Sequence, residues 1–400
     1  MPIKYIPFIP EPVEGQAVLG NFNRILKYKG ADDVSMVLQR GMPLYEMEKQ
    51  ETVGGNPDGN LVIRGECVSA CAYLKDRGIQ VDLVYIDPPF ASGADYAKKV
   101  YIRRNPKVAE AIAQAEQELD MDELKAFEEK MYGDVWDKEK YLNWMYENLM
   151  AIKSVMSETA SIYVHLDWHI GHYVKILLDE VFGEDNFRNE IIWQRANAHS
   201  DSKQGAVHYG RMHDVIFYYA LSDESPFNMQ YTPYDQAYID QYYKNVDPDT
   251  GRRYWLDNLQ GPGGASKGNP YYEVMGISRY WRYSRERMEQ LIAEGRIVQT
   301  APGTVPKYKR YLDEMPGKPV QDMWTDVKSL GGLGSIVEER NDYATQKPVA
   351  LLERIIKASS NEGMLVADFF GGSGVTAAVA GKLGRRFIHC DIGLNSIQTT

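Results

Sequence analysis

The residues best suited to chemistry in this chain follow a short apolar run at 83–86, which has the composition of a buried strand. Directly after it come Asp87, Pro88, Pro89 and Phe90. Two consecutive prolines fix φ and remove two backbone N–H donors, so the chain after Asp87 is stiff and rich in unpaired carbonyl groups. This segment therefore holds a carboxylate, a free carbonyl and an aromatic ring at the end of a strand. Such a combination is suited to binding a flat ring that bears an amino group, and to chemistry at that nitrogen.

A glycine-rich loop lies near the other end of the chain. An apolar strand pattern ends at Asp368, and Phe370, Gly372 and Gly374 follow before a helix pattern begins. Glycines allow a tight turn and let a ligand approach the backbone closely. About 20 residues further on, a second strand ends at Asp391, where nucleoside sites place an acid that holds the ribose. The spacing is not the G-x-G-x-x-G of dinucleotide sites, so S-adenosylmethionine fits the loop at least as well as NAD. The alternative is a plain strand–helix turn whose glycines serve only packing.

The elements around these two segments alternate between strand and helix. Strand–helix–strand units of this spacing predict a parallel sheet with helices on its faces. We expect a helix also in the solvated segment 105–131. The predicted strands are 61–63, 83–86, 161–166, 190–193, 364–367 and 386–390, and the predicted helices are 68–76, 141–157, 174–182, a helix from Lys347 through Ile356, and 375–383.

The texture of the sequence changes in the middle of the chain. Residues 195–336 are dense in Tyr, Gly, Pro, Asn and Arg, with one helix pattern near 284–294. We therefore interpret this region as an irregular domain inserted into an α/β domain. The predicted organisation is an N-terminal extension at 1–59, the first half of a catalytic domain at 60–194, the inserted domain at 195–336, and the second half of the catalytic domain at 337–400.

The inserted region carries a local excess of positive charge. Between residues 279 and 310, eight basic residues stand against three acidic ones, a local net charge of +5 in a chain whose net charge is −11. Arginine reads guanine edges and phosphates, and interleaved aromatic rings stack on bases, so the cluster favours contact with nucleic acid. The alternative is a solvated surface with internal ion pairs. The residues that we expect to make this contact are Arg279, Arg282, Arg285, Lys307, Lys309 and Arg310.

The three cysteines and the apolar runs limit the class of protein. No run of residues approaches the length of a membrane span and no signal sequence is evident, so we expect a cytoplasmic protein without membrane attachment. Cys67 and Cys71 lack partners at zinc-site spacing and are interpreted as small apolar core residues, so no metal site is predicted.

Taken together, these segments resemble the β class of amino DNA methyltransferases, in which the catalytic domain is circularly permuted. The segment 87–90 matches the catalytic motif, 368–374 matches the cofactor loop, and 343–348, with Thr345 and Lys347, matches the Thr-x-Lys-Pro segment that precedes that loop. The strand that ends at Asp167 matches another segment of the family. The order of motifs is most similar to that of modification subunits of type III restriction systems and related solitary bacterial enzymes.

The resemblance implies a fold and a set of site residues. The fold is an α/β, Rossmann-like, mostly parallel sheet of seven strands, with the inserted domain serving in target recognition. The cofactor implied is S-adenosylmethionine, with Lys347 and Thr345 near its carboxylate, Asp391 on the ribose and Glu66 at the adenine edge. The cofactor-binding residues implied are Glu66, Asp87, Thr345, Lys347, Asp368, Phe370, Gly372, Gly374 and Asp391.

The function implied is methyl transfer from S-adenosylmethionine to the N6 amino group of a flipped adenine in double-stranded DNA. Asp87 and the Pro88 carbonyl accept the two N–H groups of the amine, and Phe90 stacks on the base. One alternative is methylation of cytosine N4 by the same fold, but the cytosine enzymes more usually have serine at the position of Asp87. A second alternative is a non-catalytic DNA-binding scaffold subunit. A restriction subunit and a homodimer are further expected partners. Because the chain stops soon after Asp391, we expect the last helix to be short.

Overall fold

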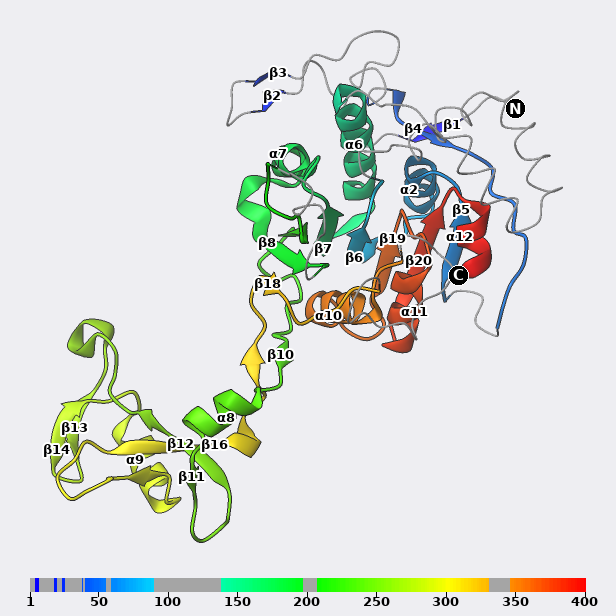
Figure 1. Ribbon diagram of the computed structural model, residues 1–400. Helices are drawn as coiled ribbons and strands as arrows, with labels where there is room; N and C mark the ends of the chain where they lie inside the picture. The colour runs from blue at the N-terminus through cyan, green and yellow to red at the C-terminus, as the bar shows by residue number, and fades with distance from the viewer. Residues whose placement is uncertain are drawn as a thin grey trace. The chain divides into compact units, whose positions relative to one another are not determined.

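The computed structural model describes residues 4–6, 18–19, 24–25, 38, 40–54, 59–89, 138–196, 207–330 and 346–400. The chain divides into two compact units (Figure 1). Unit 1 comprises Met1–Asn228 and Gln321–Thr400, and unit 2 comprises Met229–Val320. Among the described residues, no helix is both long and apolar enough to cross a membrane.

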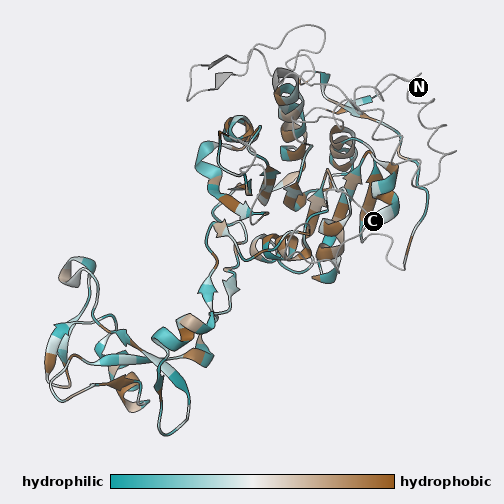
Figure 2. Ribbon diagram, in the orientation of Figure 1, coloured by the Kyte–Doolittle hydropathy of each residue, from teal (hydrophilic) through white to brown (hydrophobic). Residues whose placement is uncertain are grey.

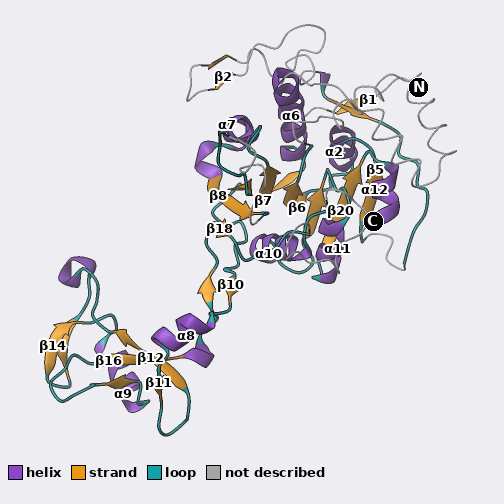
Figure 3. Ribbon diagram, in the orientation of Figure 1, coloured by secondary structure: helices purple, strands orange, loops and turns teal. Residues whose placement is uncertain are grey.

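Unit 1 is built on an eight-stranded sheet in the order β18-β8-β9-β7-β6-β19-β20-β5 (Figure 3). Its pairings are parallel except that β9 runs antiparallel to both of its neighbours. The strands are β5 (Leu61–Arg64), β6 (Val81–Ile86), β7 (Met156–Leu166), β8 (Phe187–Gln194), β9 (His213–Ala220), β18 (Met323–Trp324), β19 (Leu365–Asp368) and β20 (Arg386–Asp391).

Helices connect the parallel strands of this sheet, and one more helix follows the last strand. They are α2 (Cys67–Asp76), α6 (Lys138–Lys153), α7 (Gly171–Phe182), α10 (Val349–Ser359), α11 (Val375–Lys382) and α12 (Leu394–Thr399), with the 3-10 turn η1 (Glu184–Asn186) between α7 and β8. At the N-terminal end, β1 (Lys4–Ile6) pairs antiparallel with β4 (Met42–Leu44), and β2 (Val18–Leu19) pairs with β3 (Arg24–Ile25).

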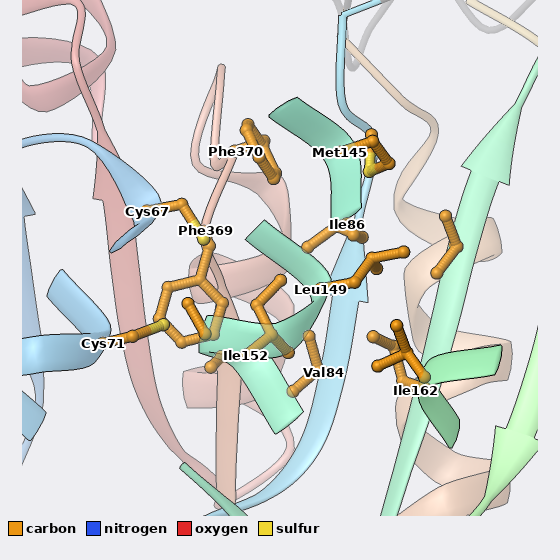
Figure 4. Packing of buried hydrophobic residues seen from close by; sticks show 14 of the residues in the cluster. Cys67, Cys71, Val84, Ile86, Met145, Leu149, Ile152, Ile162, Phe369 and Phe370 are labelled. Atoms are coloured by element: carbon orange, nitrogen blue, oxygen red, sulfur yellow. The ribbon is translucent and has the colours of Figure 1, made fainter. Parts of the chain in front are cut away.

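The two faces of the sheet bury different residues, because successive side chains of a strand point to opposite sides. On one face, Val84 and Ile86 of β6 pack with Leu149 and Ile152 of α6 in a continuous apolar cluster (Figure 4). On the other face, the buried Tyr163 hydroxyl lies 2.7 Å from Ser359 Oγ of α10. Hydrophobic residues are accordingly concentrated on the sheet and the helices beside it (Figure 2).

Residue spacing explains why α10 forms where it does. Leu351, Leu352, Ile355 and Ile356 recur at helical spacing, and all four are fully buried. Burying each such side chain contributes about 1.5–3 kcal/mol to folding. Cys67 and Cys71 are likewise buried, free, and part of the apolar cluster that contains Phe369, which confirms their interpretation as core residues (Figure 4).

Unit 2 is a small antiparallel assembly. Its four-stranded sheet has the order β11-β12-β16-β15, and β13 and β14 form a separate hairpin. Ser284 caps α9 by accepting a hydrogen bond from the backbone N–H of Arg287, which confirms the helix predicted near 284–294. The elements are β10 (Tyr231–Thr232), α8 (Gln236–Tyr242), β11 (Asn245–Val246), β12 (Arg253–Asn258), η3 (Gly264–Lys267), β13 (Tyr271–Val274), β14 (Ile277–Tyr280), α9 (Arg285–Ala293), β15 (Ile297–Val298), β16 (Lys307–Tyr311), η4 (Leu312–Glu314) and β17 (Lys318–Pro319).

The predicted α/β elements are confirmed with small shifts, but two expectations differ from the structure. The helix predicted at 141–157 ends at Lys153, because the backbone N–H of Val81 bonds to the carbonyl of Val155 and Met156 already pairs with Val81 in β7. The sheet has eight strands instead of seven, the extra one being the two-residue β18. The segment 105–131, for which a helix was predicted, lies outside the described residues.

The boundaries 195 and 336 of the predicted inserted domain also differ from those of unit 2. The strand β9 lies between β7 and β8 in the central sheet, and β18 pairs with β8 at its edge. Both therefore belong to unit 1, and the separate compact unit starts only at Met229 and ends at Val320.

Candidate active site

The carboxyl ends of the parallel strands β6, β19 and β20 bring three carboxylates to one edge of the sheet. Asp87 follows β6, Asp368 ends β19 and Asp391 ends β20. Direct pairing of β19 with β6 on one side and β20 on the other holds them as neighbours, although the first is far from the other two in sequence. In open parallel sheets this edge is where ligands bind.

Asp87 is the most exposed of the three carboxylates, and its two oxygens have different surroundings. Its Oδ2 forms an ion pair with Lys347 Nζ, while its Oδ1 is buried and has no hydrogen-bond partner among the described residues. The side chains are 17% and 16% exposed respectively, so water screens the pair only partly. Lys347 thus orients the carboxylate, and the second acceptor oxygen stays without a partner among the described residues.

The residues after Asp87 keep this end of the strand stiff. Pro88 is buried and Pro89 is half-buried, and neither has a backbone N–H that would compete for the carboxylate. Phe90 and Thr345 lie outside the described residues, so their assigned roles stay predictions. Lys347 was expected near the cofactor's carboxylate, and the structure brings it to Asp87.

Asp368 holds the start of the glycine loop. Its Oδ1 accepts the backbone N–H of Phe370 at 3.0 Å, and its Oδ2 accepts the Thr376 hydroxyl at 2.6 Å. Burial raises the pKa of Asp368 to about 7, and the nearby carboxylates of Asp87 and Asp391 add to the rise. The site therefore has a surplus of negative charge that a cation would stabilise.

The loop needs glycine at Gly374 because of its backbone conformation, and at Gly371 because a side chain has no room there. Gly374, the residue before α11, has φ 79°, which L-residues with a side chain rarely adopt. At Gly371, an added Cβ would lie 2.2 Å from the ring of His389. This ring is buried, and burial lowers the pKa of His389 to about 4, so it packs as a neutral imidazole.

Asp391 fixes the far side of the loop. Its Oδ2 accepts the N–H of Gly372 at 2.9 Å and its Oδ1 accepts the N–H of Gly393 at 2.8 Å. Nearby, Glu66 precedes α2 and accepts a hydrogen bond from the Ser69 hydroxyl at 3.0 Å.

Aromatic side chains of α6 approach the loop, a feature that the sequence reading missed. The ring of Trp144 meets that of Phe370 edge-on, with centroids 5.7 Å apart. The ring of Tyr141 lies 5.5 Å from that of Trp144. The signal was available, because Tyr141 and Trp144 are three residues apart in a predicted helix and so share one face.

A buried polar chain supports the sheet behind Asp87. The Tyr85 hydroxyl lies 2.9 Å from His165 Nδ1, and His165 Nε2 lies 3.3 Å from Asp214 Oδ2. Asp214 also forms an ion pair with Arg195. Burial works to raise the pKa of Asp214, but the interactions with His165 and Arg195 outweigh it, and the pKa is lowered. Strands β6, β7 and β9 are thereby linked at the edge where the carboxylates lie.

The six residues expected to contact DNA lie in unit 2, and ion pairs engage half of them. Lys309 pairs with Asp247 at 2.8 Å, and Arg310 and Arg282 pair with Asp257 at 2.7 and 3.5 Å. The other three have different surroundings. Arg279 donates to the Gln260 side chain at 3.1 Å, Arg285 lies 5.4 Å above the ring of Tyr272, and Lys307 is paired in β16 opposite Asn258.

A sequence profile of the DNA methylases that modify N6 or N4 amino groups matches residues 81–400, a range that spans Asp87 and the glycine loop. The chain belongs to the DNA methylase family. The central sheet with helices on both faces is the α/β methyltransferase fold, and S-adenosylmethionine is the cofactor of this family.

Two curated relatives and one solved structure illustrate the similarity. The type II methyltransferase M.EcaI of Enterobacter cloacae is 25% identical over 94% of this chain and 76% of its own length. The Mod subunit of the type III restriction-modification enzyme StyLTI of Salmonella typhimurium is 27% identical over 83% of this chain and 52% of its own, so the chain spans about half of that relative. The crystal structure of an M1.HpyAVI–SAM complex is 14% identical, with a TM-score of 0.40 over 85% of this chain and 96% of that one.

The residues present in this DNA methylase fit its cofactor. The glycine loop, the carboxylate of Asp391 and the negative charge around Asp368 suit a nucleoside that carries a positively charged sulfur. Among the described residues there is no cluster of three or more His, Cys, Asp or Glu side chains that would hold a metal ion.

The packing of the glycine loop gives a first prediction. Replacing Gly371 with Ala pushes a methyl group into the His389 ring, so we expect the free energy of unfolding to fall by about 1–3 kcal/mol and the affinity for S-adenosylmethionine to fall with it. Denaturant melts and calorimetric titration measure the two effects.

Gly381→Ala is the matched control, because its added Cβ meets only the Phe387 ring at an ordinary 3.7 Å. It lies within α11, where alanine should stabilise the helix by roughly 0.5–1 kcal/mol. Equal stability and cofactor affinity in the two variants would refute the account of the loop.

Proposed function

We propose that this protein transfers a methyl group from S-adenosylmethionine to the N6 amino group of an adenine in double-stranded DNA, within a specific sequence. The placement of Asp87 carries the proposal: it combines an oxygen held by Lys347 with a buried oxygen that no described residue bonds. The same sheet edge carries the cofactor loop. An acceptor beside a methyl-donor site suits an acceptor substrate that bears N–H groups.

The chemistry follows from the nucleophile. The lone pair of an exocyclic amine is delocalised into the base, so the nitrogen is a weak nucleophile. S-adenosylmethionine supplies an electrophilic methyl group on a positively charged sulfur. Asp87 Oδ1 accepts one N–H of the amine and the Pro88 carbonyl is proposed to accept the other, which localises the lone pair on nitrogen. Asp87 or water then takes the proton that the methylated nitrogen loses.

The target base has to leave the double helix, since its amino nitrogen is not accessible in a stacked pair. Phe90, by resemblance to the family motif, stacks on the flipped base. The aspartate at position 87 favours adenine, because the cytosine-N4 enzymes of this fold more usually have serine there. Methylation of cytosine N4 is the competing reaction.

Unit 2 is proposed to recognise the DNA target. Arg279 and Arg285 are its best candidates, because neither has an ion pair among the described residues, whereas Lys309, Arg310 and Arg282 are paired with acids. Arginine contacts phosphates and guanine edges through a planar fork of donors. The similarity to Mod subunits extends the proposal to a restriction subunit and a homodimer as partners.

Asp87→Asn tests the catalytic assignment. The substitution keeps the size of the side chain but removes the charge that Lys347 holds and one of the two acceptor oxygens. We expect methyl transfer to DNA, followed with labelled S-adenosylmethionine, to slow by about 10²-fold or more, with cofactor affinity changed much less.

Asp179→Asn is its matched control. Asp179 is 20% exposed and pairs with Lys175 at 2.7 Å, so it resembles Asp87 in burial and in having a lysine partner, but it lies on α7. Its replacement should leave the transfer rate unchanged. An Asp87→Asn protein that turns over like the wild type would remove Asp87 from the chemistry.

The raised pKa of Asp368 predicts a pH dependence of cofactor affinity. Below about pH 7 the carboxyl is largely protonated, and a bound sulfonium favours the charged form. Binding therefore releases a proton, and affinity should increase as pH rises from about 5.5 and level off above about 7.5. Titration calorimetry in buffers of different ionisation enthalpy measures the released proton, and a flat affinity with no proton release would contradict the prediction.

A further inference from the structure

Tyr141 has a buried hydroxyl group that the fold does not use. The side chain is fully buried, and among the described residues the hydroxyl has no hydrogen-bond partner. Two other buried tyrosines of unit 1 have partners: the Tyr85 hydroxyl bonds His165, and the Tyr163 hydroxyl bonds Ser359. A buried hydroxyl without a partner costs folding free energy, which points to a partner that arrives with a ligand.

The position of Tyr141 is next to the candidate active site. Its ring packs on Trp144, whose ring in turn meets Phe370 of the cofactor loop, with centroid separations of 5.5 and 5.7 Å. Burial raises the pKa of the Tyr141 hydroxyl, and the carboxylates of Asp167 and Asp87 raise it further. The hydroxyl therefore stays protonated, remains a donor, and lies within electrostatic reach of Asp87.

The two neighbouring carboxylates are not equivalent. Asp167 already accepts the backbone N–H of His169 at 2.9 Å, and its other oxygen lies 2.5 Å from that residue's ring nitrogen. Asp87 Oδ2 is held by Lys347, and Asp87 Oδ1 has no partner among the described residues. This region thus has one buried acceptor, on Asp87, and one buried donor, on Tyr141. Neither has a hydrogen-bond partner among the described residues.

A donor and an acceptor of this kind match one edge of an aminated base. In adenine and cytosine, the carbon that carries the amino group is bonded to a ring nitrogen with a lone pair, so an N–H donor and an acceptor lie side by side. We propose that Tyr141 donates a hydrogen bond to this ring nitrogen while Asp87 accepts from the amino group. Tyr141 is then a substrate-contacting residue that orients the amine; this inference rests on the proposed function.

Tyr141→Phe separates this role from a structural one because the two predict different activities. Phenylalanine keeps the ring that packs on Trp144 and removes only the hydroxyl. If the residue were merely structural, loss of an unpaired buried hydroxyl would leave activity unchanged and stability equal or higher. We expect stability equal or higher, but kcat/KM for methylation of DNA lower by roughly 3- to 10-fold, the equivalent of one neutral hydrogen bond.

Tyr163→Phe is the matched control. It too removes one buried tyrosine hydroxyl, but that hydroxyl lies 2.7 Å from Ser359 Oγ on the α10 side of the sheet. This variant should melt at a lower temperature and keep the wild-type kcat/KM. The reverse pattern in the two variants would overturn the proposal.

Substrates that lack single ring nitrogens identify the contact. In duplexes whose target adenine is replaced by 1-deazaadenine, wild type and Tyr141→Phe should react at the same rate, because the bonded nitrogen is missing. With 7-deazaadenine the difference between the two proteins should persist. A difference that persists with 1-deazaadenine overturns the proposed contact. A wild-type protein that methylates no DNA refutes the proposed function instead, which keeps the two failures distinct.

Discussion

The site depends on the parallel pairing of β6 with β19 and on the ion pair between Lys347 and Asp87 that lies beside it. The pairing joins two parts of the chain that are separated by the whole of unit 2. Because both strands run in the same direction, Asp87 and the glycine loop emerge at one edge of the sheet. Asp82 strengthens this junction from the opposite end of β6, where it accepts the Leu365 N–H at 2.9 Å and the Ser157 hydroxyl at 3.2 Å.

The charges at the carboxyl ends of β6, β19 and β20 give the three carboxylates of the site different properties. The carboxylates of Asp87, Asp368 and Asp391 lie close together at this edge. Lys347 forms an ion pair with the first of them. Asp391 accepts hydrogen bonds from backbone N–H groups and the pKa of Asp368 is raised to about 7, whereas Asp87 has a buried oxygen without a hydrogen-bond partner among the described residues. A positively charged methyl donor would offset the repulsion among these carboxylates.

The local elements of unit 1 could be predicted from sequence, because glycine turns, apolar runs and helical spacing act over a few residues. The bond between Lys347 and Asp87 could not, since it depends on strand register and rotamers across 260 residues of sequence. The strand β9 was missed although Val215 to Tyr219 is a strong strand pattern, because the surrounding texture suggested a separate domain. The charge count over residues 279–310 did not reveal the ion pairs of Lys309 and Arg310, because their partners Asp247 and Asp257 lie outside that segment.

The central claim is that the open oxygen of Asp87 acts on the amino nitrogen of adenine. The most direct test is to digest DNA from cells that express the protein to nucleosides and to identify the methylated product by mass spectrometry, with cells that express Asp87→Asn beside them. The account predicts N6-methyladenine above background with the wild type and none above background with the variant. N4-methylcytosine would contradict the choice of base, and unmethylated DNA from both cultures would contradict the account itself.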